Sequence, residues 1–261
     1  MTPTTRAALP AARTWTLACL LAMAGPAMAA AALSGRSSEL AGQYLIGAGG
    51  DTEAASAADS EVSTEDRPAL QIDLVGEKSG VTSGTPWTAT AALSAGHQFL
   101  VDERGGALAR LTSTGSSTSF AQASWPALAF AAVPGSGNEL ILEFSVDAPT
   151  PYGLSATVSA SGTTAQDISA TVELQMLTLR WGSVQIVSTA LGHATEWREG
   201  VLQPGQYRMR AVAGVEAFHS AQTSASASWA YDLTLAPVPE PGTLALAAAG
   251  LAVVAGGARR R

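Results

Sequence analysis

Apolar and polar residues alternate along most of the chain from residue 68 onward. In Leu70–Leu74 and Leu140–Val146 every second residue is apolar, and most of the residues between them are polar. The same period of two recurs in Tyr152–Val158 and in Trp229–Leu235. This period is typical of a half-buried β-strand, in which successive side chains point to opposite faces of a sheet. These segments are therefore predicted to be strands.

Turn residues separate the predicted strands at short intervals. Arg104-Gly105-Gly106 lies between two apolar segments and predicts a hairpin turn, and Gly135–Asn138 predicts another turn. The best helix candidate is Phe120–Val133, but Pro126 interrupts it, so we favour strands there as well. We expect an all-β domain over residues 68–236, an antiparallel β-sandwich of jelly-roll or immunoglobulin-like type.

The segment from residue 30 to residue 67 has a different composition. Asp51–Asp66 contains six acidic residues among Ala, Ser and Thr, and its only large aliphatic residue is Val62. Such a segment buries too little apolar surface to offset the entropy lost on ordering. We therefore predict that residues 30–67 form a flexible acidic segment, with one short strand at Gln43–Ile46.

The first residues have the layout of a secretory signal peptide. Arg6 and Arg13 precede the apolar run Trp15–Gly25, and Ala27 and Ala29 supply small residues where signal peptidase requires them. We expect residues 1–29 to be removed by cleavage before Ala30. The only cysteine, Cys19, lies in this segment, so the mature chain would have no disulfide, thiolate nucleophile or cysteine zinc site.

The last residues combine a proline-rich step, an apolar span and a basic cluster. Val238-Pro239-Glu240-Pro241 is held extended by its prolines, which presents Glu240 on an exposed strip. The uncharged run Thr243–Ala258 would be about 24 Å long as a helix, somewhat short of a full membrane span. Snorkelling side chains of Arg259, Arg260 and Arg261 would extend it, and the positive-inside rule places these arginines on the cytoplasmic side.

This layout over residues 237–261 resembles the PEP-CTERM sorting signal of Gram-negative bacteria, which is read by the membrane-embedded enzyme exosortase. The resemblance implies that signal peptidase and exosortase process the protein and that the inner membrane holds it transiently by a C-terminal transmembrane helix. It further implies release to the cell surface or extracellular matrix, where exosortase systems accompany exopolysaccharide and biofilm production. The alternative is an ordinary membrane anchor that is never cut.

Charge narrows the possible partners of the mature chain. Between residues 30 and 240 there are nine Lys and Arg against 21 Asp and Glu, a net charge of −12 without histidine. A chain with so few cations has no basic patch to neutralise phosphates, so we expect no nucleic-acid binding.

Candidate catalytic groups are sparse. The three histidines do not have metal-ligand spacing, the HxxE formed by His193 and Glu196 is a weak signal, and no GxSxG nucleophile motif is present. Two acid pairs, Glu196 with Glu199 and Asp102 with Glu103, adjoin apparent loops or turns and are weak candidates for glycoside hydrolysis. We therefore predict a non-enzymatic protein without metal or cofactor, with a secreted hydrolase as the least favoured alternative.

One candidate binding residue stands out. Trp197 lies among charged residues in Glu196–Gly200, which we expect to be a loop. Its indole could stack on a sugar ring while neighbouring carboxylates bind hydroxyls, which would make the protein a carbohydrate-binding module. Alternatively Trp197 covers one end of the sandwich. We predict core or sheet-edge packing for Trp87, Trp125, Trp181 and Trp229.

Overall fold

The computed structural model describes residues 31–62, 69–163, 167–177, 183–219 and 222–236. These residues form thirteen strands and one 3-10 turn, η1. The elements are β1 (Ala31–Ala48), β2 (Asp51–Val62), β3 (Ala69–Thr82), β4 (Thr85–Arg104), β5 (Ala107–Ala123), β6 (Leu128–Val133), η1 (Gly135–Gly137), β7 (Asn138–Val146), β8 (Thr150–Gly162), β9 (Ser169–Met176), β10 (Ser183–Thr189), β11 (Gly192–Leu202), β12 (Gly205–His219) and β13 (Gln222–Leu235).

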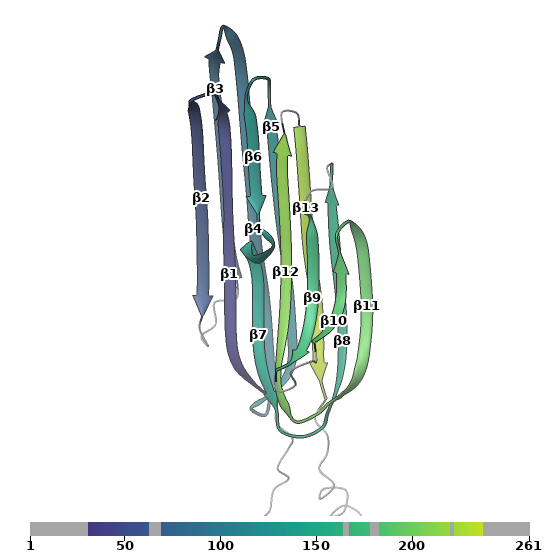
Figure 1. Cartoon of the computed structure of the whole chain (residues 1–261). Helices are drawn as coiled ribbons and strands as arrows, with labels where there is room; N and C mark the ends of the chain where they lie inside the picture. Colours follow the sequence, from purple (N-terminus) through teal and green to yellow (C-terminus); the bar gives the residue numbers. More distant parts are fainter. Residues whose placement is uncertain (1–30, 63–68, 164–166, 178–182, 220–221, 237–261) are drawn as a thin grey trace, which may run out of the picture. The chain divides into compact units, whose positions relative to one another are not determined.

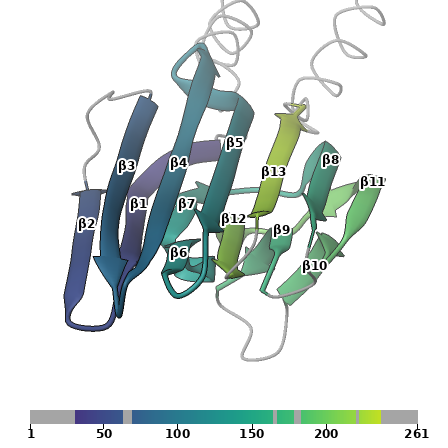
Figure 2. The ribbon, with the colours of Figure 1, turned by 90° about the horizontal axis from the view of Figure 1, so that it is seen from above.

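The described strands form two antiparallel sheets that pack face to face, which confirms the predicted sandwich. The seven-stranded sheet has the order β10-β9-β12-β6-β1-β2, with β7 also paired to β1 and β12. The six-stranded sheet has the order β11-β8-β13-β5-β4-β3. Figure 2 shows the two sheets as two rows of strands. The chain passes repeatedly between the sheets, so neighbours within a sheet are often far apart in sequence.

Strands β6 and β7 lie end to end between β1 and β12 (Figure 1). β6 pairs with the last part of β1 and β7 with its first part, and both also pair with β12. The turn η1 interrupts this line at the predicted Gly135–Asn138 turn. The two short strands therefore act as one long strand with an irregularity in its middle.

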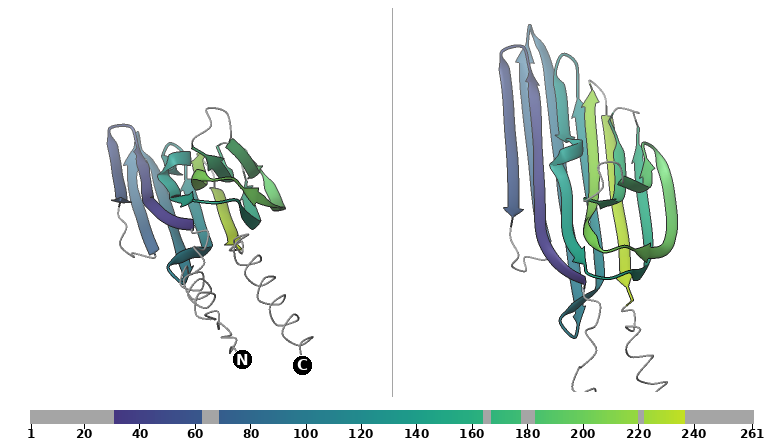
Figure 3. Two further views of the ribbon diagram at one scale, coloured as in Figure 1. Left: turned by 90° about the horizontal axis from the view of Figure 1, so that it is seen from below. Right: turned by 60° about the horizontal axis from the view of Figure 1, so that its bottom comes forward.

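The chain enters β1 and leaves β13 at the same end of the sandwich (Figure 3). Ala31 at the start of β1 pairs with Val146, the last residue of β7. Leu235 at the end of β13 pairs with Tyr152, near the start of β8. Only residues 147–149 separate β7 from β8, so Ala31 and Leu235 lie at one end of the described domain.

The predicted flexibility of residues 30–67 is wrong for the 32 residues of this segment that the structure describes. β1 and β2 pair continuously from Ser37 opposite Val62 to Ala48 opposite Asp51, and the predicted short strand at Gln43–Ile46 lies in the last third of β1. The physical reason is that acids on the core-facing side of β2 are paired. Arg36 of β1 donates to Glu61 at 2.6 Å, Tyr44 of β1 donates to Glu53 at 2.8 Å, and Lys78 of β3 binds Asp51 at 2.7 Å.

Other local predictions have mixed outcomes. Gly105 and Gly106 join β4 to β5 with positive φ angles, which confirms the predicted hairpin turn. Phe120–Val133 contains the end of β5 and all of β6, in agreement with our preference for strands.

The predicted signal peptide (residues 1–29) and sorting tail (237–261) lie outside the described residues. No helix in the described part of the chain is long and apolar enough to span a membrane.

In the core, several large side chains pack directly against glycines. Trp229 of β13 lies directly across from Gly115 of β5, where a Cβ atom would come within 2.2 Å of the indole ring. The indole Nε1 also donates to the Ser113 hydroxyl at 3.3 Å. Trp87 and Trp229 are buried as predicted, whereas Trp125 is 76% exposed, which contradicts its predicted packing role. Trp181 lies outside the described residues.

A small polar network crosses the core. His97 of β4 and Asn138 of β7 lie in opposite sheets, with His97 Nδ1 2.9 Å from Asn138 Oδ1. The Asn138 amide nitrogen donates to the Ser116 carbonyl oxygen and to the Ser117 hydroxyl, each at 2.9 Å. Asn138 therefore presents its oxygen to His97, and His97 Nδ1 is the donor. Burial lowers the pKa of His97, opposed in part by the hydrogen bond to Asn138.

The buried imidazole predicts an acid-sensitive fold. Because the pKa of His97 is lower when folded than when unfolded, the unfolded chain binds a proton first as the pH falls below about 6.5. The free energy of unfolding should therefore fall between pH 7 and pH 5.5, by at most about 1.4 kcal/mol per pH unit for one proton. Urea unfolding at several pH values in this range would measure the free energy of unfolding. Its dependence on pH should be weaker in His97→Gln than in the unmodified protein. The exposed His193→Gln variant is the control, and an equal dependence on pH in all three proteins would contradict the prediction.

The ion pair between β1 and β2 predicts a large stability effect. The side chains of Arg36 and Glu61 are 2% and 19% exposed, so Arg36→Met leaves a largely buried carboxylate without its partner. We expect the free energy of unfolding to fall by about 3 kcal/mol. Arg110→Met, which breaks an exposed pair with Asp232, should cost less than about 1 kcal/mol. Chemical denaturation would measure both, and equal losses would contradict the structural role assigned to Arg36.

Candidate functional site

The outer face of the six-stranded sheet is lined by small hydroxyl-bearing side chains. Along β5 and β13 the odd-numbered positions 113–121 and 223–235 are buried, so the even-numbered ones face outward. Four residues of one outward row, Ser159, Ser228, Ser116 and Gly96, come from four neighbouring strands. The next row along contains Ser161, Ser226, Thr118 and Ser94. These rows bring hydroxyls together from segments more than 100 residues apart.

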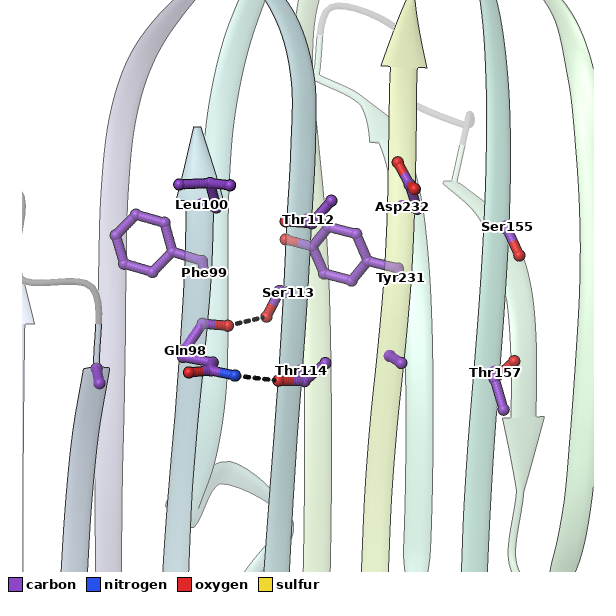
Figure 4. A pocket seen from close by; sticks show the side chains of 12 residues that line it. Gln98, Phe99, Leu100, Thr112, Ser113, Thr114, Ser155, Thr157, Tyr231 and Asp232 are labelled. Atoms are coloured by element: carbon purple, nitrogen blue, oxygen red, sulfur yellow. Dashed lines mark hydrogen bonds between the residues drawn. The ribbon is translucent and has the colours of Figure 1, made fainter. Parts of the chain in front are cut away.

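Three connected depressions lie along this face. The first, of about 600 Å³, is lined by side chains that include Gln98, Thr112, Ser155, Thr157 and Asp232, from β4, β5, β8 and β13 (Figure 4). The second, of about 400 Å³, shares Gln98 and Thr114 with the first and extends over Gly96 and Ser116. The third, of about 620 Å³, shares Ser94 with the second and extends over Thr118 and Ser226. We call the three together the hydroxyl trough.

The side chains in the trough retain much of their hydrogen-bonding capacity. Ser161 and Ser226 hydroxyls lie 2.8 Å apart, and the Gln98 amide nitrogen donates to Thr114 Oγ1 at 3.2 Å (Figure 4). A hydroxyl has one donor and two acceptor sites, so a bonded pair such as Ser161 and Ser226 still has one donor and three acceptor sites. The trough can therefore donate and accept hydrogen bonds along its length.

Apolar side chains mark both ends of the trough. Leu100, 64% exposed, lines the first depression, and Val75 and Phe120 line the third. A polar floor between apolar ends suits a ligand that carries both hydroxyls and C–H surfaces.

The charges in the trough are acidic. None of the described residues that line its three depressions is a lysine or an arginine, whereas Asp73 and Asp232 both line it. Arg110 lies beside the first depression and donates to Asp232 through Nε at 2.9 Å. This hydrogen bond raises the pKa of Arg110. The Arg110 guanidinium is thus already paired with a carboxylate of the same sheet.

Trp197 lies on the same outer face, but in a strand and not in the predicted loop. It belongs to the edge strand β11 and pairs with Ser155 of β8, a residue of the first depression. Its indole lies over Gly153, where a Cβ atom would be 3.2 Å from the ring, and the residue is 62% exposed. The alternative in which Trp197 covers one end of the sandwich is therefore wrong, because the indole lies on the face of the sheet.

The carboxylates expected around Trp197 are divided between two sides of β11. Successive residues of a strand point to opposite faces, so Glu196 lies on the side opposite Trp197. Glu196 accepts hydrogen bonds from Arg198, the shorter at 2.8 Å. Glu196 and Glu199 are three positions apart in one strand, and so are His193 and Glu196, so neither pair shares a face. Sequence proximity does not place either pair in a common site.

The remaining candidate groups are dispersed. His97 is buried in the core, and Asp102 contacts Arg104 at 3.5 Å beside the β4–β5 turn. Among the described residues no group of three or more His, Cys, Asp and Glu side chains could hold a metal ion. The residues predicted for processing lie outside the described part of the chain: Ala27, Ala29, Ala30, Val238, Pro239, Glu240, Pro241, Arg259, Arg260 and Arg261.

Sequence reasoning did not find the hydroxyl trough. Its serines and threonines are common residue types without a motif, and they converge only through the pairing of β4, β5, β8 and β13. The one available signal was the run of Ser and Thr at alternate positions in Thr112–Thr118 and Ser224–Ser228.

Comparison with known proteins identifies the tail of the chain. The family model of the PEP-CTERM protein-sorting motif matches residues 237–261, which confirms the resemblance seen in the sequence. This motif implies that the chain is exported and processed by exosortase, with an anchored stage before release at the surface. A search of curated proteins finds no match.

Two of the solved structures that are similar to this chain are both distant from it. A structure titled "CBM4 structure and function" is 16% identical, covers 42% of this chain and 84% of its own, and has a TM-score of 0.23. The VP2 subviral particle of infectious bursal disease virus is 8% identical, covers 82% of this chain and 68% of its own, and has a TM-score of 0.16. At these TM-scores neither structure informs the function of this chain.

Proposed function

We propose that this protein is a non-enzymatic component of the cell envelope or extracellular matrix, linked to exopolysaccharide and biofilm formation. The observation that carries the proposal is the PEP-CTERM sorting motif at residues 237–261. In this proposal signal peptidase cuts before Ala30, and exosortase cuts near the Pro239-Glu240-Pro241 step. The basic cluster and the apolar span are then left behind in the inner membrane.

The position of the cuts supports a folded product. β1 begins at Ala31 and β13 ends at Leu235, so both proposed cuts fall outside the thirteen strands. The released chain would therefore keep every strand pairing of the sandwich. With a net charge of −12 between residues 30 and 240, it would also stay soluble and repel anionic surfaces.

A second candidate function is a carbohydrate-binding module of the matrix. It is favoured by the exposed indole of Trp197 on the same face as the hydroxyl trough. Aromatic rings offer apolar surface for the C–H faces of sugars, and the neighbouring hydroxyls offer hydrogen bonds. A binding role of this kind would hold the released protein in the matrix.

Intact mass spectrometry of the protein from its own host tests the processing proposal. In the presence of exosortase we expect a chain that begins at Ala30 and ends near Glu240. Without exosortase, or after deletion of Pro239–Pro241, the chain should retain Leu244–Arg261 and stay with the membrane. A chain that retains this segment in both strains would show a permanent anchor. Normal shortening and export of the deletion variant would equally contradict the proposal.

Truncation of the exposed indole tests the carbohydrate-binding candidate. Trp197→Ala should weaken retention on the host's own exopolysaccharide by roughly fivefold, since one stacked aromatic contact contributes about 1 kcal/mol. Trp125→Ala is a matched control, because Trp125 is also exposed but lies in the β5–β6 connection, away from Trp197. Pull-down with immobilised exopolysaccharide would measure the difference. Equal retention of both variants would remove Trp197 from the binding site.

A further inference from the structure

We propose that the hydroxyl trough binds one extended, uncharged polysaccharide chain, which lies parallel to the strands of the six-stranded sheet. The proposal rests on the carbohydrate-binding function suggested above and moves its centre from Trp197 to the middle of the sheet. Trp197 then lies beside one end of the bound chain, since its strand neighbour Ser155 lines the first depression.

The dimensions of the trough favour a polymer over a single sugar. Asp232 lines its first depression and Ser224 its third, and both belong to β13. Eight residue steps of a strand separate them, which corresponds to about 26 Å. The three depressions connect through shared residues along this length. A monosaccharide would leave most of the lined surface unused, whereas an extended chain would contact all of it.

The chemistry of the trough matches the two kinds of surface on a sugar chain. Hydroxyl and amide side chains such as Gln98, Thr114 and Ser226 can both donate and accept, as sugar hydroxyls do. Leu100 and Phe120 near the two ends provide apolar surface for C–H faces. This combination differs from that of a phosphate site, which needs several donors or cations directed at one point.

The charges of the trough select against acidic polysaccharides. Its lining includes Asp73 and Asp232 and no Lys or Arg among the described residues. The adjacent guanidinium of Arg110 already binds Asp232. A chain of uronic acids would bring carboxylates beside Asp73 without a Lys or Arg in the described lining to pair with them, which costs free energy. The ligand class is therefore a neutral glycan.

The backbone beneath the trough is held by strand pairing without a ligand. Its floor comes from β4, β5 and β13, which have a paired strand on both sides, from β8 between β11 and β13, and from the edge strand β3, which contributes Asp73 and Val75. Because strand pairing already orders this backbone, binding pays no entropy for ordering it, so weak contacts distributed over many positions can sum to a useful affinity.

Affinity electrophoresis tests this site. The full protein from its host would be run in native gels that contain β-1,3-glucan, galactomannan or dextran, with alginate as the anionic comparison. We expect retardation by at least one neutral polysaccharide and none by alginate. Ser116→Arg and Ser226→Arg place bulky side chains on the outward side of the trough and should abolish the retardation. Ser145→Arg, on the outer face of the other sheet, is the matched control and should behave as the unmodified protein.

The outcomes separate this site from the other proposals. Absence of retardation by every neutral polysaccharide, or alginate binding of equal strength, would overturn the ligand class. Retardation that persists in both Ser116→Arg and Ser226→Arg would overturn the location, and sensitivity to Trp197→Ala alone would return the site to β11. Circular dichroism of each variant would confirm that it is folded. Masses of the processed chain measure sorting independently, so failure of one proposal leaves the other testable.

Discussion

The structure depends on the close packing of large side chains against glycines on facing and neighbouring strands. Tyr44 and Leu93 reach across the sandwich to Gly76 and Gly42, where added Cβ atoms would lie 2.4 Å and 2.6 Å from them. Trp229 uses Gly115 within its own sheet in the same way. The two contacts across the sandwich constrain the spacing of the sheets, and the Trp229 contact constrains the register of β13 on β5. In the predicted mature chain, which lacks cysteine, this packing and the hydrogen-bonded ladders must hold the sheets together.

The acidic strand β2 shows how a polar segment joins such a core. Its core-facing acids, including Asp51, Glu53 and Glu61, lie at the edge of the sheet, where Arg36, Tyr44 and Lys78 reach them. The composition of the segment predicted disorder because it takes account only of the apolar surface within the segment and not of partners elsewhere in the chain. The partners belong to β1 and β3, and the pairing is visible only once those strands are in place. Inward-facing charges at an edge strand also discourage pairing with another chain.

The period-two pattern predicted the sandwich because alternate residues of a strand point to opposite faces, so the sequence of each strand shows which face is buried. Leu140–Val146 and Trp229–Leu235 are strands as expected, and Gly105-Gly106 is the expected turn. The pattern could not reveal which strands are neighbours. Trp197 shows the limit, since charged residues on both sides predicted a loop, whereas the exposed edge strand β11 tolerates charges on both faces. The hydroxyl trough could not be predicted, because the pattern does not show which strands are neighbours and the rows of the trough join positions of different strands, such as Ser116 and Ser228.

The geometry of the domain relates its export to its candidate binding face. The chain enters β1 and leaves β13 at one end of the sandwich, so any tether attached through Ala31 or Leu235 pulls on that end only. The hydroxyl trough lies on the broad outer face of the six-stranded sheet, along the length of its strands. A cut beyond Leu235 would therefore change the reach of the domain without altering this face. If the proposed glycan binding holds, it would not depend on the cut, because the cut and the trough lie in different parts of the chain.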